Sequence, residues 1–191
     1  MVGGILVKAS ASLFAQRPML FKNSQYQNLT FDQVYNLLLN FIKQAPNYHY
    51  KLSIGTDSQV DEGTVFVTAI HMHRVGRGAI GFISTQTISR PIRSLREKIY
   101  LETSKTLEVA ALFTPEKIDG LIEPLLNTRE HHGDIKFEFH LDIGNSGATK
   151  DLIGEMIAMA RGTAFEPKIK PESYAASSYA DRYTKFRIVK K

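Results

Sequence analysis

Two stretches of the chain alternate apolar and polar residues, and each alternation runs into an aspartate. In the first stretch, apolar side chains recur from Tyr48 to Ile54, and a Gly-Thr-Asp-Ser sequence containing Asp57 follows. In the second, apolar residues occupy every other position from Ile135, and the polar series ends at Asp142. A period of two residues is typical of a half-buried strand. The sequence therefore predicts two strands with an aspartate at the carboxyl end of each.

The segments around these strands predict a single α/β domain. Two runs rich in β-branched and aromatic residues are separated by the turn-forming sequence Gly76-Arg77-Gly78, which favours an antiparallel hairpin. The predicted elements are a helix over 31–44, strands over 48–54, 64–74 and 79–89, helices over 92–113 and 115–126, a strand over 134–142, a helix over 149–161, a short strand over 167–170 and a helix over 173–184. Such an order favours a mixed sheet with helices on its faces. We expect this domain over residues 30–191, preceded by a loosely attached extension over residues 1–29.

Composition removes several kinds of chemistry. The chain has 191 residues and no cysteine, which excludes disulfides, thiolate metal sites and cysteine nucleophiles. Any metal must therefore be bound by oxygen or imidazole ligands. The formal net charge of +5 permits a nucleic-acid partner. Because the short apolar stretch near the amino terminus is interrupted by Lys8 and no long apolar run exists, we expect a cytoplasmic protein that does not associate with membranes.

A third carboxylate, Glu102, accompanies the two aspartates. It lies on the apolar stripe of the helix predicted over 92–113, so it should point toward the sheet, where a carboxylate needs a partner or a metal. Glu97 and Glu108 lie on the same predicted helix and remain alternatives for this role. Carboxylate oxygens are the ligands that Mg²⁺ and Mn²⁺ prefer. The sequence therefore makes a divalent-metal site at Asp57, Asp142 and a helix glutamate the leading hypothesis.

The order of these acidic residues, with Asp181 in the last predicted helix, resembles the ribonuclease H-like superfamily. More narrowly, four segments are similar to the bacterial YkuK family: IGTDSQ at 54–59, YLETS at 100–104, HLDIG at 140–144 and KPESYAASSYA at 170–180. The resemblance covers about residues 31–185. It implies a three-layer ribonuclease H-like fold with a mixed five-stranded sheet and helices on both faces.

The resemblance also implies a function: hydrolysis of phosphodiester bonds in RNA, DNA or their hybrid by two-metal catalysis with Mg²⁺ or Mn²⁺. Carried over residue by residue, it implies that the catalytic and metal-binding residues are Asp57, Glu102, Asp142 and Asp181. Candidates for contact with substrate phosphate are Ser58, Asn145, Lys150 and Arg182. An alternative function is a nucleic-acid-binding or regulatory module that keeps this fold and does not cleave.

Several features have simpler interpretations. An aspartate at a strand end is also a common turn former, because its side chain can accept a hydrogen bond from the backbone two residues on. The loop over 144–150 precedes a predicted helix and could hold a phosphate or nucleotide on backbone amides, although it lacks the Walker spacing. A plain connection between strand and helix is the favoured interpretation of this loop, and phosphate binding is kept as a secondary one.

The histidines give little support to an imidazole metal site. His71 and His73 share one face of a predicted strand and His131-His132 form a pair in a turn, but neither pair has a convincing third ligand. His140, two residues before Asp142, is the histidine that we consider for an active-site role.

Overall fold

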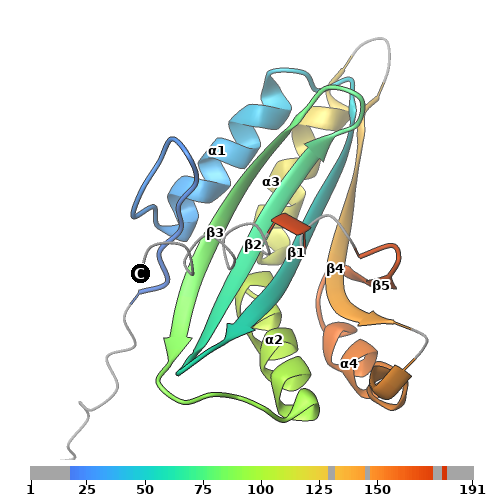
Figure 1. The fold of residues 1–191 in the computed structure, drawn as a ribbon. Helices are drawn as coiled ribbons and strands as arrows, with labels where there is room; N and C mark the ends of the chain where they lie inside the picture. Colours follow the sequence, from blue (N-terminus) through green and yellow to red (C-terminus); the bar gives the residue numbers. More distant parts are fainter. Residues whose placement is uncertain (1–17, 129–131, 145–146, 174–177, 180–191) are drawn as a thin grey trace, which may run out of the picture.

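A mixed five-stranded sheet organises the protein (Figure 1). The computed structural model describes residues 18–128, 132–144, 147–173 and 178–179. Its elements are α1 (Phe31–Lys43), β1 (His49–Val60), β2 (Thr64–Arg74), β3 (Ala79–Ile88), α2 (Leu95–Ala110), α3 (Pro115–Leu126), β4 (Asp134–Gly144), a 3-10 helix η1 (Gly147–Leu152), α4 (Ile153–Ala160) and β5 (Glu166–Lys170). The strand order is β3-β2-β1-β4-β5, with β1, β4 and β5 parallel and β2 antiparallel to both of its neighbours. The predicted α/β fold with a mixed five-stranded sheet is confirmed.

Local sequence signals explain where most elements begin and turn. Thr30 and Gln33 form a reciprocal capping box at the start of α1, and Pro115 occupies the first turn of α3. The hairpin between β2 and β3 turns through Gly76 and Gly78, which both have positive φ angles. None of the helices in the described part of the chain is long and apolar enough to cross a membrane.

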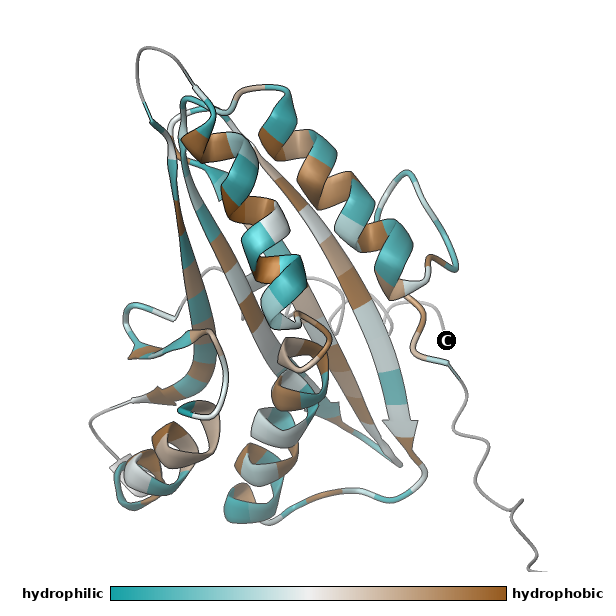
Figure 2. Cartoon of the chain, turned by 180° about the vertical axis from the view of Figure 1, so that it is seen from behind, coloured by the Kyte–Doolittle hydropathy of each residue, from teal (hydrophilic) through white to brown (hydrophobic). Residues whose placement is uncertain are grey.

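The main core lies between the sheet and helices α1 to α4. Figure 2 shows these helices in front of the sheet. In β1 the side chains of Tyr50, Leu52 and Ile54 point to this face, and all three are 1% exposed or less. They share the core with Val34, Leu38 and Ile42 of α1. Alternate residues of β1 therefore face the helices, and the residues between them, including Asp57, face the other side of the sheet.

A smaller apolar cluster covers part of that other side. It contains Val67, Ala69 and Ile83, against which the ring of Tyr179 packs. A Cβ atom at Gly81 would lie 2.6 Å from Cζ of Tyr179, so a glycine is needed for this close approach. Of the helix predicted over 173–184, the structure describes Ser173, which lies in a turn, and Ser178 and Tyr179, which are helical. The contact of Tyr179 with the smaller cluster places this part of the chain on the sheet face opposite α1 to α4 (Figure 1).

The structure differs from expectation at three points. β1 continues to Val60, because Thr56 to Gln59 keep pairing with β2, so Asp57 lies inside the strand and not beyond its end. The helix predicted over 149–161 begins as η1 and becomes α-helical only at Ile153. Residues 18–29 are not loosely attached: Phe21 is 1% exposed, and the backbone of Lys22 exchanges two hydrogen bonds with Ile83 of β3.

Candidate active site

Asp57 and Asp142 occupy matching positions on neighbouring parallel strands. The register of β1 and β4 runs from His49 opposite Asp134 to Gly55 opposite His140. The same register extended by two residues places Asp57 opposite Asp142, just beyond the last backbone pair. Both side chains then lie on the sheet face opposite the helices. The parallel pairing of β1 with β4 thus explains how two aspartates 85 residues apart in the sequence come together.

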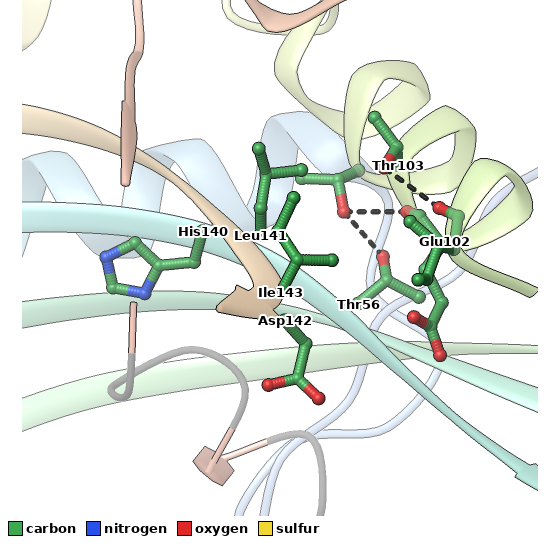
Figure 3. A pocket seen from close by; sticks show the side chains of 9 residues that line it. Thr56, Glu102, Thr103, His140, Leu141, Asp142 and Ile143 are labelled. Carbon is green, nitrogen blue, oxygen red and sulfur yellow. Dashed lines mark hydrogen bonds between the residues drawn. The ribbon is translucent and has the colours of Figure 1, made fainter. Parts of the chain in front are cut away.

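Glu102 reaches the same end of β1 from helix α2. Its carboxyl group is buried, with the residue 7% exposed, and accepts a 2.7 Å hydrogen bond from the hydroxyl of Ser58. Lys98, one turn earlier on α2, places its Nζ 3.7 Å from the same carboxylate oxygen. Figure 3 shows Glu102 and Asp142 on either side of Thr56, with both carboxyl groups directed to the same side of the pocket.

A chain of buried hydroxyl groups fixes α2 against the sheet at this point. The Thr56 hydroxyl lies 2.9 Å from that of Thr68 on β2 and 2.8 Å from that of Thr106 on α2. Thr106 in turn donates to the backbone carbonyl of Glu102. These contacts hold the helix turn that carries Glu102 in one position relative to β1.

The pKa of Glu102 is raised mainly because its carboxyl group is buried. Burial raises the pKa of its carboxyl group to about 7, against the lowering effects of the Ser58 hydrogen bond and of Lys98. Asp57 and Asp142 each raise this pKa further by repulsion. The negative charges of the two aspartates therefore disfavour the ionised form of Glu102, as burial does.

Asp142 has a positively charged neighbour on the edge strand. Nζ of Lys170 lies 2.7 Å from Oδ1 of Asp142, and the two side chains are 55% and 26% exposed. This contact was not predicted from the sequence, because it depends on the irregular register of β4 and β5 between His140 and Gly144. The ion pair satisfies part of the negative charge at the solvent-facing side of the site.

Three of the four predicted acidic site residues therefore gather at one end of β1 and β4. The helix carboxylate that faces the sheet is Glu102: Glu97 forms an ion pair with Arg90, and Glu108 is exposed. Within the described ranges, no group of three or more histidine, aspartate or glutamate side chains is arranged tightly enough to hold a metal ion. The fourth acidic residue, Asp181, lies outside the described residues.

The predicted phosphate contacts are placed differently from one another. Ser58 is buried on the face of β1 opposite Asp57, and its hydroxyl donates a hydrogen bond to the Glu102 carboxylate. Lys150 is exposed on η1. Asn145 and Arg182 lie outside the described residues.

His140 belongs to a second buried polar group, which precedes Asp142 in β4. It is 2% exposed, and its Nε2 donates to Oε2 of Glu138 at 2.9 Å. Glu138 is 8% exposed and also lies 3.8 Å from Nζ of Lys51. The hydrogen bond from His140 lowers the pKa of Glu138, although burial opposes it. The alternation along β4 could have indicated that Glu138, His140 and Asp142 share one face, but not that this face is buried here.

His71 of β2 lies on the same face of the sheet. Burial lowers its pKa to about 4, and the neighbouring His73 and His140 lower it further. Among the described residues its Nδ1 has no hydrogen-bond partner. His71 is therefore neutral at physiological pH.

Comparisons with known proteins agree with this architecture. The sequence profile described as "Ribonuclease H-like" matches residues 33–185. A Bacillus subtilis (strain 168) protein named "Uncharacterized protein YkuK" is 47% identical over 167 residues, which cover 87% of this chain and 97% of that protein. No solved structure matches the chain significantly.

Proposed function

The chain belongs to the ribonuclease H-like family, and from that premise we propose that it is a nuclease that hydrolyses phosphodiester bonds of RNA or DNA with Mg²⁺ or Mn²⁺ held by Asp57, Glu102 and Asp142. Asp181 is the proposed fourth ligand. The observation that carries the proposal is the convergence of three acidic residues from β1, α2 and β4 on one end of the sheet.

The chemistry of these donors fits a divalent cation. Each side chain offers hard oxygen ligands, and Glu102 is buried next to two other acids that raise its pKa. A charge arrangement of this kind is costly for a folded protein unless a cation compensates it. In the described positions the carboxyl groups do not form a closed coordination shell, and Lys170 and Ser58 occupy some of their oxygens.

The roles of the residues follow from their positions. Bound divalent ions supply an activated water and stabilise the oxygen that leaves phosphorus. Asp57 and Asp142, on adjacent strands, would hold an ion from the solvent-facing side, where a nucleic-acid backbone can approach. Glu102 would hold it from the helix side. The Thr56–Thr106 contact keeps the helix turn in place, and Ser58 orients the Glu102 carboxylate.

A second candidate is a nucleic-acid-binding module that does not cleave. The ion pair between Lys170 and Asp142 favours it, because an ammonium group already neutralises one of the proposed ligands. In that case the acidic site would be a structural remnant, and binding of nucleic acid would not need a metal ion.

The experiment that tests the proposal is a cleavage assay on labelled single-stranded RNA, single-stranded DNA, both duplexes and the hybrid, with Mg²⁺ or Mn²⁺ and with EDTA. The full-length protein is compared with Asp57→Asn and Asp142→Asn, whose folding is checked by circular dichroism. We expect metal-dependent cleavage that both substitutions abolish. Binding without cleavage in every condition would reject the nuclease and support the binding module.

A further inference from the structure

Lys170 is held next to the acidic site by features of the backbone. It ends β5, opposite Gly144 of β4. Asp142 lies in the irregular part of β4 between His140 and Gly144. Lys170 can therefore reach across the edge of the sheet to Asp142.

The turn that follows Lys170 is anchored to β4 beside Asp142. The backbone amides of Glu172 and Ser173 both donate to the carbonyl of Ile169. The hydroxyl of Ser173, which is 0% exposed, donates to the carbonyl of Leu141 at 2.8 Å. The backbone on either side of Lys170 is thus anchored, whereas its side chain is 55% exposed and ends in the ion pair with Asp142.

Stability alone does not account for a lysine at this position. Ion pairs between exposed groups typically contribute only about 0 to 1 kcal/mol, because solvent screens them. Lys170 instead places its charge on Asp142, one of the two aspartates that raise the pKa of Glu102. An ammonium group on a flexible stem is a common binder of phosphate oxygens in proteins.

We propose that Lys170 is a phosphate-binding residue of this site: it pairs with Asp142 and, once released from Asp142, binds a backbone phosphate of a nucleic acid. This inference rests on the proposed function, because a cation bound at Asp142 is what would release the lysine. The ligand class is a phosphodiester anion. Because Lys170 exchanges Asp142 for a phosphate when a cation binds at the acidic site, cation binding and nucleic-acid binding are coupled.

The test frees Lys170 from its ion pair by a substitution at Asp142, so that no metal ion is needed. In EDTA, Asp142→Asn removes the anion that holds the ammonium group, so this variant should bind a short fluorescein-labelled single-stranded RNA more tightly than the wild type, as measured by anisotropy. Because loss of Asp142 also removes a repulsive charge, the decisive comparison is between Asp142→Asn/Lys170→Met and Asp142→Asn/Lys43→Met. Lys43 is an exposed lysine in the last turn of α1, so both double variants lose one positive charge.

We expect the Lys170→Met double variant to bind the RNA more weakly than the Lys43→Met double variant, on the order of tenfold at low salt, with a salt dependence reduced by about one counterion. Lys170→Arg in the same background should restore binding, because the positive charge is retained. Equal affinity of the two double variants, or no RNA binding by any form, would overturn the inference. Since no cleavage is measured, this result is independent of whether the wild type proves to be a nuclease.

Discussion

Two buried glutamates on either side of the sheet behave in opposite ways. Glu102 on α2 and Glu138 on β4 are 7% and 8% exposed. Burial raises the pKa of Glu102 to about 7, with Asp57 and Asp142 adding to the effect. The pKa of Glu138 is instead lowered, first by its hydrogen bond from His140. The raised pKa of Glu102 comes mainly from burial, whereas at Glu138 the hydrogen bond from His140 outweighs the effect of burial.

The difference separates a structural acid from a candidate functional one. Glu138 has His140 and Lys51 as partners, so its ionised form is compensated within the fold. Glu102 has a hydroxyl donor and Lys98, but burial, with smaller contributions from its two acidic neighbours, still disfavours its ionised form. Acids with a strongly shifted pKa, such as Glu102, are found at functional sites more often than elsewhere. The middle of β4 therefore supports the fold, and the end of β1 and β4 is where we place the chemistry.

The largest expected effect is a difference in cleavage rate between a substitution at Asp142 and one at Glu138. Asp142→Asn should lower the metal-dependent cleavage rate by about a thousandfold or more, because it removes a ligand on which the transition state depends. Glu138→Gln should stay within about tenfold of the wild type, since its partners lie away from the site. Initial rates on the best substrate from the cleavage panel measure both. Equal losses in the two variants would remove the distinction between the regions.

The next effect concerns stability and pH at Glu102. A carboxyl group whose pKa is raised on folding contributes stability below its unfolded pKa of 4.5, and that contribution is lost as the pH rises through about 7. Glu102→Gln should therefore stabilise the metal-free protein by about 2 to 3 kcal/mol at about pH 8. At about pH 4 the difference should disappear. Urea unfolding in EDTA at both pH values measures it, and a variant that is less stable than the wild type at the higher pH would contradict this account.

Glu138 should show the opposite pH dependence. Its pKa is lowered on folding, so its contribution to stability is present above the unfolded pKa and is lost as the pH falls through the folded value. Glu138→Gln should destabilise the protein by about 1 to 2 kcal/mol at neutral pH, because a hydrogen bond to a charged group is replaced by a neutral one. The same unfolding series in acid should show the loss shrinking. No loss at neutral pH would mean that Glu138 is not compensated as described.

The smallest effect tests the positive charge beside Glu102. Lys98→Met removes an ion pair between residues one turn apart on α2, which is typically worth about 0.3 to 0.5 kcal/mol. It should also move the pH at which stability declines to a higher value, since Lys98 lowers the pKa of Glu102. Unfolding midpoints across the pH range measure the shift. A shift to lower pH would contradict the assigned direction.

Much of the fold could be predicted from the sequence, because the hydrophobic periods of two and of about four residues are strong along this chain. The capping box at Thr30 and the glycines at 76 and 78 also marked element ends correctly. The end of β1 was misjudged, because Thr56 to Gln59 look like a turn in isolation and become a strand only by pairing with β2.

The candidate site was only partly predictable. The helical stripe selected Glu102, and the structure places it against the sheet while Glu97 and Glu108 point elsewhere. Ser58 was grouped with the phosphate contacts, although strand alternation puts it on the face opposite Asp57. The contact of Lys170 with Asp142 could not be predicted, because it depends on an irregular register between two parallel strands.

Calorimetric titration of the metal-free protein with Mn²⁺ tests the central claim most directly. The wild type and Glu138→Gln should bind Mn²⁺ with similar affinity, and Asp142→Asn should show no binding in the same range. Binding by Asp142→Asn as tight as that of the wild type, or no binding by the wild type, would contradict a divalent-metal site at the end of β1 and β4.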